Sequence, residues 1–237
     1  MRKKINRFWM LFCCIALSFV SIAGFLFHVH QSKPILAAYS PSPVIIIDAG
    51  HGGMDGGAVG VDGQIEKEIN LSIALKLDVM LRAYGFQTIL TRDSDRSIHS
   101  AEAKTVRQQK TSDLKNRLKL LEDTSSGILI SIHQNKYSQS SARGTQVFYG
   151  KNCAESKELA EMLQKTITGY LQPENQREVK QATKDIYILY QASKPAVMVE
   201  CGFLSNVSEA ARLTDEEYQE QIAFSICAAL MNCLADS

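Results

Sequence analysis

Three hydrophobic segments of the chain each lead to a histidine or a glutamate. The segment "VIIIDAGHGG" (44–53) runs to His51, "ILISIHQN" (128–135) reaches His133, and "AVMVECGF" (196–203) contains Glu200. Catalytic zinc is typically held by three imidazole or carboxylate ligands, with a fourth position left open for water or substrate. The sequence contains no C-x-x-C or H-E-x-x-H motif. The pattern therefore favours a zinc site in which His51 and His133 are the first two ligands.

The third ligand of such a site must be an acidic residue near the same place. Glu66 begins a predicted helix directly after the glycine-rich loop that carries His51. Glu68, Asp55 and Asp62 are alternatives on composition alone, and Glu66 could also stabilise the helix N-terminus without any metal. The residue pattern leaves the third ligand open.

Glu200 has the surroundings expected of a catalytic base. It follows four apolar residues, so its carboxylate should be partly desolvated, which raises the pKa and makes the group more basic. We expect Glu200 to take a proton from the attacking water and to pass it to a leaving amine. A structural salt bridge is the alternative role for a carboxylate in this position.

The rest of the sequence alternates between strand-like and helix-like segments. The predicted strands are 44–48, 86–91, 128–133, 144–149, 186–190 and 196–200. The predicted helices are 66–83, 112–121, 155–170 and a last helix to about 234 that a capping box at 214–217 opens, whereas the charged segment 95–110 is predicted to be a loop. This alternation predicts an α/β fold with a twisted, mostly parallel mixed sheet flanked by helices. Ligands bind such sheets at the carboxyl ends of the strands.

The N-terminal residues differ from the rest of the chain. Residues 1–7 carry four positive charges, and 8–27 contain none, which is about the length of a membrane-spanning helix. We expect 1–30 to be a signal or membrane-anchor segment, 31–43 a linker, and 44–237 a single catalytic domain. A cleaved signal peptide is the alternative to an anchor, but Leu36 fits a cleavage site poorly. Both interpretations place the domain outside the cytoplasm.

Charge and cysteine content exclude some functions. Five of the 26 Lys and Arg residues precede Tyr39, so the remainder has 21 basic and 25 acidic residues and a net charge of −4. That balance argues against nucleic-acid binding. The cysteines beyond Tyr39 are not clustered and are expected to be buried free thiols, with one disulfide as the alternative. They are Cys153, Cys201, Cys227 and Cys233.

Five motifs follow one another between about Val44 and Leu234. They are "IIIDAGHGGMDGGA", "GQIEKEINLSIA", "LTRD", "SIHQN" and "VECGFLSN". In this order they resemble the zinc-dependent N-acetylmuramoyl-L-alanine amidases of the amidase-3 type. The resemblance implies a fold related to the zinc exopeptidases and one Zn²⁺ per chain. It also implies hydrolysis of the amide bond between N-acetylmuramic acid and L-alanine in peptidoglycan.

The same resemblance implies roles for four residues. The family's zinc ligands fall on His51, Glu66 and His133, which selects Glu66 among the acidic candidates. The catalytic glutamate of the family falls on Glu200. We expect His99 not to be a ligand, because it lies in a charged segment without periodicity.

The expected arrangement, one anchor segment followed by a catalytic domain alone, resembles that of the sporulation-type members of this family. That implies removal of stem peptides from the spore cortex before muramic lactam forms, and it leaves any accessory protein unidentified. The sequence departs from the family pattern at Gln134, Lys136 and Glu178. These residues are expected at the substrate rim, so the departures concern substrate preference and not the metal.

Five further residues are candidates for supporting roles. Asp48 is expected to hold the second ring nitrogen of a zinc-bound histidine, although a strand-end cap is the simpler role. Asn135 and Asn206 are expected to fix the loops after His133 and Glu200. Arg92 and Lys180 are candidates for binding a peptide carboxylate or the developing oxyanion, although such cations are often only solvated or structural.

Two other functions are compatible with the same residues. A cysteine-dependent cell-wall hydrolase would use Cys201 as nucleophile and His133 as base. A non-catalytic peptidoglycan-binding module would keep the fold without the reaction. A chelator separates the first alternative from the zinc enzyme, and the intact set of four residues argues against the second.

Overall fold

The computed structural model describes residues 43–234, which include nearly all of the expected catalytic domain. The expected signal or anchor segment and almost all of the expected linker lie outside the described residues. Within 43–234, no helix is both long enough and apolar enough to cross a membrane.

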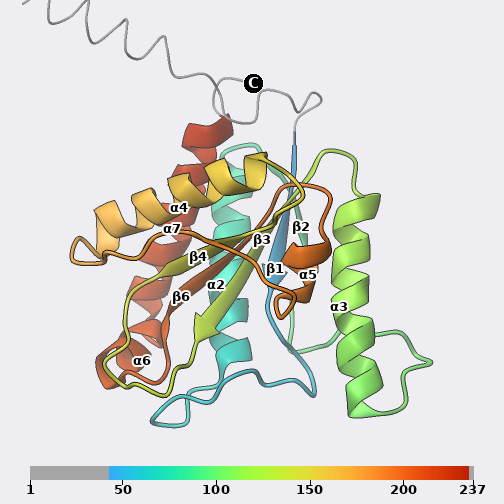
Figure 1. The fold of residues 1–237 in the computed structure, drawn as a ribbon, viewed down its shortest axis with the longest axis horizontal. Coiled ribbons are helices and arrows are strands. Elements are labelled where there is room, and N and C mark those ends of the chain that lie inside the picture. The colour runs from blue at the N-terminus through green and yellow to red at the C-terminus, as the bar shows by residue number, and fades with distance from the viewer. Residues whose placement is uncertain (1–42, 235–237) are drawn as a thin grey trace, which may run out of the picture. The chain divides into compact units, whose positions relative to one another are not determined.

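A six-stranded mixed sheet forms the centre of the fold (Figure 1). Its order is β2-β1-β3-β6-β4-β5, and only β4 and β6 pair in antiparallel fashion. The strands are β1 (Val44–Ala49), β2 (Gln87–Leu90), β3 (Gly127–Asn135), β4 (Gln146–Tyr149), β5 (Lys180–Gln181) and β6 (Ala196–Phe203). The predicted α/β class and mostly parallel sheet are therefore confirmed.

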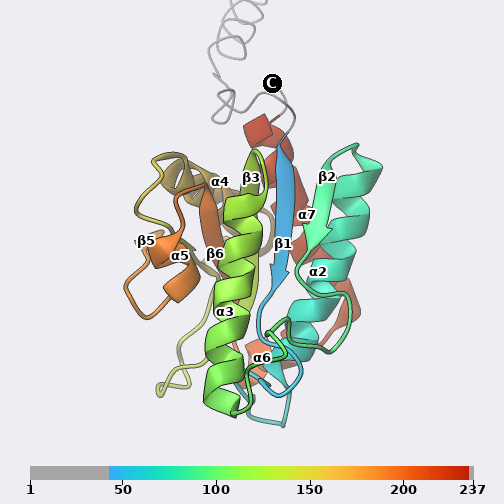
Figure 2. The same ribbon diagram turned by 90° about the vertical axis from the view of Figure 1, so that its right-hand side faces the viewer.

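Helices cover both faces of this sheet. Residues that alternate along each strand divide into two clusters, one with Ile45 and Ile47 and the other with Ile46. The first cluster packs against α2 (Glu66–Ala83), α4 (Glu155–Leu171) and α7 (Glu216–Leu234). The second lies under α3 (Val106–Asp123) and α5 (Tyr187–Gln191), and Figure 2 shows α3 in front of the sheet. A short helix, α6 (Val207–Leu213), follows β6.

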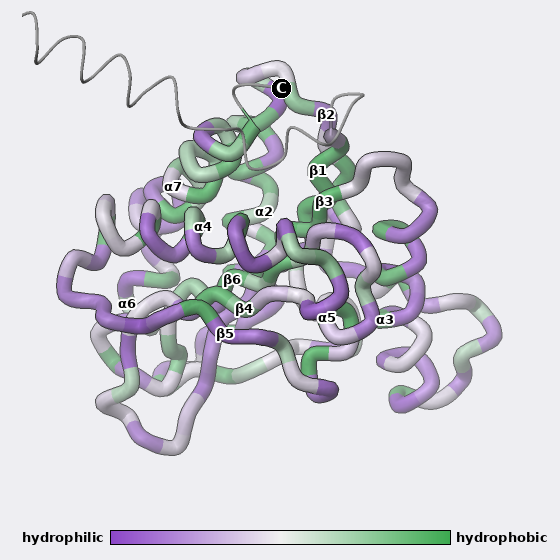
Figure 3. The backbone as a smooth tube through the Cα atoms, turned by 45° about the horizontal axis from the view of Figure 1, so that its top comes forward, coloured by the Kyte–Doolittle hydropathy of each residue, from purple (hydrophilic) through white to green (hydrophobic). Residues whose placement is uncertain are grey.

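The central strands β1, β3 and β6 each begin with a run of apolar residues. Figure 3 shows the hydrophobic residues concentrated along β1 and β3, as a sheet covered on both faces requires. The sequence of β1 becomes polar only at Asp48, next to its last residue. The polar side chains of these strands therefore lie mainly toward their carboxyl ends.

Three predicted elements differ in the structure. The predicted strand 186–190 is the helix α5, and α3 begins at Val106 inside the expected loop. The side chain of Thr105 and that of Gln108 form a capping box at the start of α3. At α7, Asp215 and not Thr214 provides the cap, because Asp215 Oδ1 accepts a hydrogen bond from the Tyr218 backbone.

Candidate active site

The backbone turns sharply after β1, at the residues that carry His51. His51 has a φ of 62°, a left-handed conformation that is uncommon for a residue other than glycine. Two buried arginines hold the chain there. Arg117 donates to the carbonyl oxygens of Ala49 and His51 at 2.8 and 2.7 Å. Arg92 donates to those of Ala49 and Gly50 at 2.9 and 3.0 Å.

The glycines of this loop make room for the side chains around them. A Cβ atom on Gly50 would lie 2.2 Å from Nε2 of His133. One on Gly57 would lie 2.5 Å from Oε2 of Glu66 and 2.7 Å from the His51 ring. The "DAGHGGMDGGA" sequence therefore allows two imidazoles and a carboxylate to pack together against the backbone.

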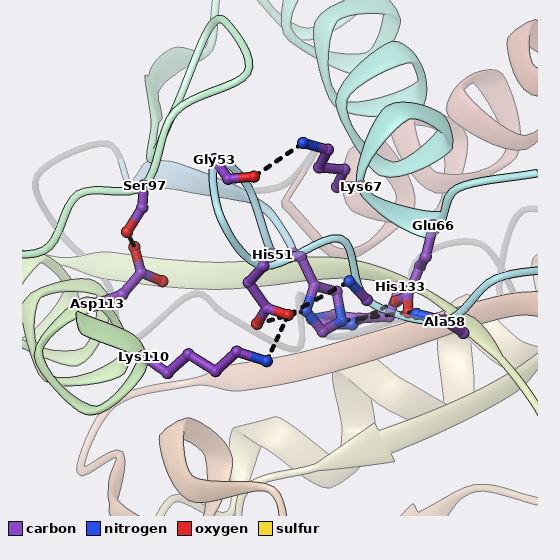
Figure 4. Close-up of polar contacts among 12 residues, drawn as sticks. His51, Gly53, Ala58, Glu66, Lys67, Ser97, Lys110, Asp113 and His133 are labelled. Carbon is purple, nitrogen blue, oxygen red and sulfur yellow. Dashed lines mark hydrogen bonds and ion pairs between the residues drawn. The ribbon is translucent and has the colours of Figure 1, made fainter. Parts of the chain in front are cut away.

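His51, Glu66 and His133 lie together at the carboxyl edge of the sheet (Figure 4). Glu66 Oε2 is 3.2 Å from Nε2 of His51, and Glu66 Oε1 is 2.9 Å from Nδ1 of His133. One ligand atom from each residue lies within 4.8 Å of the other two. Among the described residues, no other group of three His, Cys, Asp or Glu side chains comes together in this way.

The carboxylate of Glu66 is held in a fixed orientation at the start of α2. It accepts hydrogen bonds from the backbone N–H groups of Ala58 at 2.8 Å and Gln134 at 3.1 Å. Burial alone would raise the pKa of Glu66, but the hydrogen bonds from His133 and His51 outweigh it and hold the pKa well below its usual range. Glu66 is therefore an ionised, oriented oxygen donor.

These three residues fit a metal of the zinc type. Two imidazoles and one carboxylate are the donor set of many catalytic zinc sites, and each ring has a second nitrogen left for other contacts. Because Gly50 and Gly57 have no side chain, the backbone at these two residues can lie directly against the imidazole and carboxylate groups. The residues present are those that a single divalent metal ion requires.

Glu200 lies beside this group. It pairs with His133 across the parallel strands β6 and β3. Burial raises the pKa of Glu200 to about 7, and within the described residues its Oε2 atom is buried without a hydrogen-bond partner. A buried carboxylate oxygen without a partner is costly in a stable core and is typical of a functional site.

A cavity of about 320 Å³ lies against His51, His133 and Glu200, and we call it the active-site cavity. Its walls come from α3 and from the segment that leads into α5, and they include the following residues: Lys110, Leu114, Asp185, Ile186 and Tyr187. The two helices that cover the second face of the sheet thus also form the sides of the cavity.

Asp55 holds the second ring nitrogen of His51, a role that the sequence suggested for Asp48. Asp55 Oδ2 is 2.9 Å from Nδ1 of His51, and Asp55 Oδ1 pairs with Lys110 at 2.8 Å. Burial alone would lower the pKa of His51, but Asp55 and Glu66 raise it to about 9. The i, i+4 spacing of His51 and Asp55 is the signal that could have revealed this contact.

Asp48 instead belongs to a buried network under α3. It accepts hydrogen bonds from Thr91 at 2.9 Å and Ser131 at 2.6 Å and forms an ion pair with Arg117. No histidine ring nitrogen of the described residues bonds to it. Burial alone would raise the pKa of Asp48, but Arg117 and then Ser131 hold it below its ordinary value. Arg117 was not among the residues singled out from the sequence.

Arg92 also serves the backbone and not a substrate. It is 1% exposed, and besides the two carbonyl groups before His51 it donates to the carbonyl oxygen of Lys67 at 2.7 Å. The guanidinium therefore joins the loop after β1 to the first turn of α2. The expected role of Arg92 in binding a carboxylate or an oxyanion is not compatible with this burial.

The remaining residues that were expected to contact substrate differ in how deeply they are buried. Gln134 is buried, and it donates to the Asn70 side chain, so it is not part of a substrate rim. Lys136 donates to the carbonyl oxygen of Val59, and Lys180 is exposed on β5. Glu178 is also exposed.

The two asparagines are positioned after the strands that carry His133 and Glu200. Asn206 is the N-cap of α6, accepting hydrogen bonds from the backbone of Ser208 and Glu209. Asn135 ends β3, and its carbonyl oxygen accepts a hydrogen bond from Leu204. Both positions lie where the chain turns beside the site.

The group of His51, Glu66 and His133 includes neither a described cysteine nor His99. All four described cysteines are free, and Cys201 is 1% exposed. Burial raises the pKa of the Cys201 thiol far above its usual range, which argues against a thiolate nucleophile. His99 contacts Ser97 through Nδ1 at 2.9 Å.

Comparison with known proteins places this chain in one family. A family model described as N-acetylmuramoyl-L-alanine amidase matches residues 45–232. The chain belongs to this family, Amidase_3, and is a hydrolase of the N-acetylmuramoyl-L-alanine amidase class.

Two relatives are similar over most of this chain. The germination-specific N-acetylmuramoyl-L-alanine amidase of Bacillus subtilis (strain 168) is 32% identical over 226 residues, which cover 95% of this chain and 93% of the relative. The CwlD amidase from Clostridioides difficile, solved in complex with the GerS lipoprotein, is 42% identical with a TM-score of 0.78. That match covers 83% of this chain and 100% of the solved one.

A more distant structure shares the same architecture. The amidase AmiC2 of Nostoc punctiforme is 28% identical, with a TM-score of 0.70, over 83% of this chain and 99% of the other. The mixed sheet with helices on both faces is therefore the catalytic-domain fold of these amidases.

Proposed function

We propose that this amidase depends on one zinc ion per chain, held by His51, Glu66 and His133. The observation that carries the proposal is the approach of their ligand atoms to within 4.8 Å, beside the buried and unpartnered Oε2 of Glu200. When bound, zinc supplies Lewis acidity, which activates water near neutral pH and polarises the carbonyl group under attack.

The residues of the chain account for the proton transfers. Glu200 takes the proton of the attacking water on Oε2 and later gives it to the nitrogen of the leaving alanine. The raised pKa suits both steps, because the group can accept and release a proton near neutral pH. Asp55 keeps Nδ1 of His51 occupied, so Nε2, which faces Glu66, is the ring nitrogen that would hold the metal.

The bond cleaved is proposed to be the amide between the lactyl carbonyl of N-acetylmuramic acid and L-alanine. Mass spectrometry of purified peptidoglycan after incubation with the protein tests this, with and without a chelator. We expect new alanine amines that the chelator abolishes. New reducing sugar ends would indicate a glycosidase, and cleavage further along the peptide would indicate an endopeptidase.

The substrate in the cell is proposed to be the spore cortex. A germination-specific amidase and CwlD are both similar to this chain over most of their length, which supports the proposal. Removal of stem peptides would expose muramic acid residues for conversion to the lactam. The cortex of spores that lack this protein should contain no muramic lactam, and an unchanged lactam content would contradict the assignment.

Location and partners are proposed on the same basis. We propose an N-terminal signal or membrane-anchor segment at 1–30, a linker at 31–43 and the catalytic domain at 44–237, acting outside the cytoplasm. Because the solved CwlD amidase is bound to a lipoprotein, we also propose an accessory lipoprotein for this chain. Co-purification from sporulating cells tests this, and recovery of the amidase without any lipoprotein would contradict it.

A further inference from the structure

A second cavity, of about 450 Å³, lies on the same face of the sheet as the active-site cavity. Neighbouring residues of β6 and β4 line the two cavities. Glu200 and Met198 line the active-site cavity, and their partners across the antiparallel pair, Gln146 and Phe148, line the second one. Residues that pair across neighbouring strands point to the same face, so the second cavity lies next to the active-site cavity, on the β4 side of Glu200.

The lining of the second cavity differs from the active-site cavity in charge. Arg177 and Lys180 line it, and none of its lining residues is acidic. The active-site cavity, in contrast, has five carboxylates in its lining beside the two cations Lys110 and Arg117, namely Asp48, Asp55, Asp113, Asp185 and Glu200. We call the second one the cationic cavity, and its charge suits an anionic group of a substrate whose reacting bond lies beside Glu200.

Arg177 is oriented by contacts that leave some of its N–H donors free. Its Nε donates to the carbonyl oxygen of Arg143 at 2.7 Å, and Nη1 donates to Oε1 of Gln146 at 3.3 Å. Its guanidinium lies over the Phe203 ring, 4.6 Å from the centroid. A guanidinium has five N–H donors, so these contacts orient the group without using its capacity to bind an anion.

Lys180 is the second cation of this cavity. It is exposed on β5, and its ammonium group has no hydrogen bond or ion pair with any described residue. Lys180 pairs with Phe148, which pairs with Met198, so the lysine lies two strands from β6. Two strand spacings are about 10 Å. Two extended peptide residues span about 7 Å. The lysine side chain is long enough to cover the remaining distance.

We propose that the cationic cavity binds the peptide leaving group, with Arg177 and Lys180 recognising a free carboxylate on the second residue of the peptide. The proposal rests on the proposed amidase mechanism, because that mechanism places the leaving amine at Glu200. In a stem peptide that begins L-alanyl-γ-D-glutamyl, this group is the α-carboxylate of the glutamyl residue. The cavity thereby distinguishes acidic stem peptides from those in which this carboxylate is amidated.

Peptide binding tests the proposal independently of catalysis. The probes are L-alanyl-γ-D-glutamyl-L-lysine and the same peptide with the α-carboxylate amidated, titrated into the full chain by calorimetry. We expect the acidic peptide to bind at least about tenfold more tightly, as a charge-assisted contact allows. Lys180→Gln should reduce the preference to less than about threefold, because one of the two cations is lost.

Lys165→Gln is the matched control. It removes the same charge from an exposed position on α4, which covers the other face of the sheet, and should leave the preference unchanged. Equal binding of the two peptides, or no binding of either, would overturn the proposal. An equal loss with Lys165→Gln would also overturn it, because only overall charge would then matter. Loss of hydrolysis or of zinc without loss of the peptide preference would instead count against the proposed mechanism.

Discussion

Arg117 of α3 and Asp48 of β1 form an ion pair in which the two side chains are 2% and 1% exposed. The same guanidinium donates to the carbonyl oxygen of His51 and to Asp113 of its own helix. One side chain therefore joins the helix that walls the active-site cavity to the strained residue that faces Glu66. The stability of this part of the fold and the geometry of the site depend on the same contacts.

Replacement of Arg117 by Gln should destabilise the protein strongly. It leaves the Asp48 carboxylate buried without its cation, and loss of one partner of a buried pair costs about 3–5 kcal/mol. Urea unfolding of the two proteins measures the difference. Lys119→Gln is the control, because it removes an exposed i, i+4 pair with Asp123 on the same helix and should cost about 0.5 kcal/mol or less. Equal effects would contradict this account of α3.

Asp55→Asn should weaken zinc binding by about 10- to 100-fold. The amide keeps the size of the side chain but removes the charge that favours a hydrogen bond from Nδ1 of His51. A competition titration with a coloured chelator measures the affinity. Asp62→Asn changes an exposed residue of the same loop and should have no effect. If both variants bound zinc as the unaltered protein does, Asp55 would not position His51.

The raised pKa of Glu200 predicts a pH effect on the metal-free protein. Its ordinary value is 4.5, and burial raises it to about 7 in the folded state. The folded protein therefore holds a proton that the unfolded chain loses, so the stability from this group is present below pH 4.5 and is lost as the pH rises through 7. With chelator present, Glu200→Gln should show a smaller fall in unfolding free energy between these pH values. Parallel curves would contradict the shift.

Cys201→Ala should keep most of the activity. The thiol is buried, and its raised pKa leaves it protonated at neutral pH. A chelator should stop hydrolysis by this variant and by the unaltered protein, whereas iodoacetamide should have little effect on the unaltered protein. Inactivation by Cys201→Ala together with resistance to the chelator would favour the cysteine-dependent alternative.

The sequence predicted the parts of the fold that follow from local apolar patterns. The buried strands β1, β3 and β6 have continuous apolar runs, and α2 has a regular apolar stripe, so their positions were predicted closely. Parallel pairing then brings strand ends to one edge. This is why the sequence predicted the neighbourhood of His51, His133 and Glu200.

The elements that were mispredicted have unusual buried faces. Along α3 the buried positions are Asp113, Arg117 and Leu121, at helical spacing, so polar residues occupy a stripe that is normally apolar. Residues 106–110 add no buried side chain to this stripe, so their pattern does not predict a helix. The segment "YILYQ" of α5 is short and apolar, which suits a strand or a helix, and tertiary packing decides between them.

The supporting residues could not be predicted because their partners are distant in sequence. Arg117 and Asp48 are 69 positions apart, and Arg92 and Gly50 are 42 apart. Nothing in the local pattern of either arginine distinguishes a buried backbone clamp from a surface cation. Asp55 is the exception, since its spacing from His51 is local.

The zinc content and hydrolysis rate of the same preparations test the central claim most directly. His133→Ala removes a proposed ligand and should lose both zinc and activity, whereas His99→Ala should keep both. Glu200→Gln should keep about one zinc per chain while the rate falls by about 10²- to 10⁴-fold, as for a lost general base. If Glu200→Gln lost its zinc, or if His133→Ala kept it, the assignment of ligands and base would be contradicted.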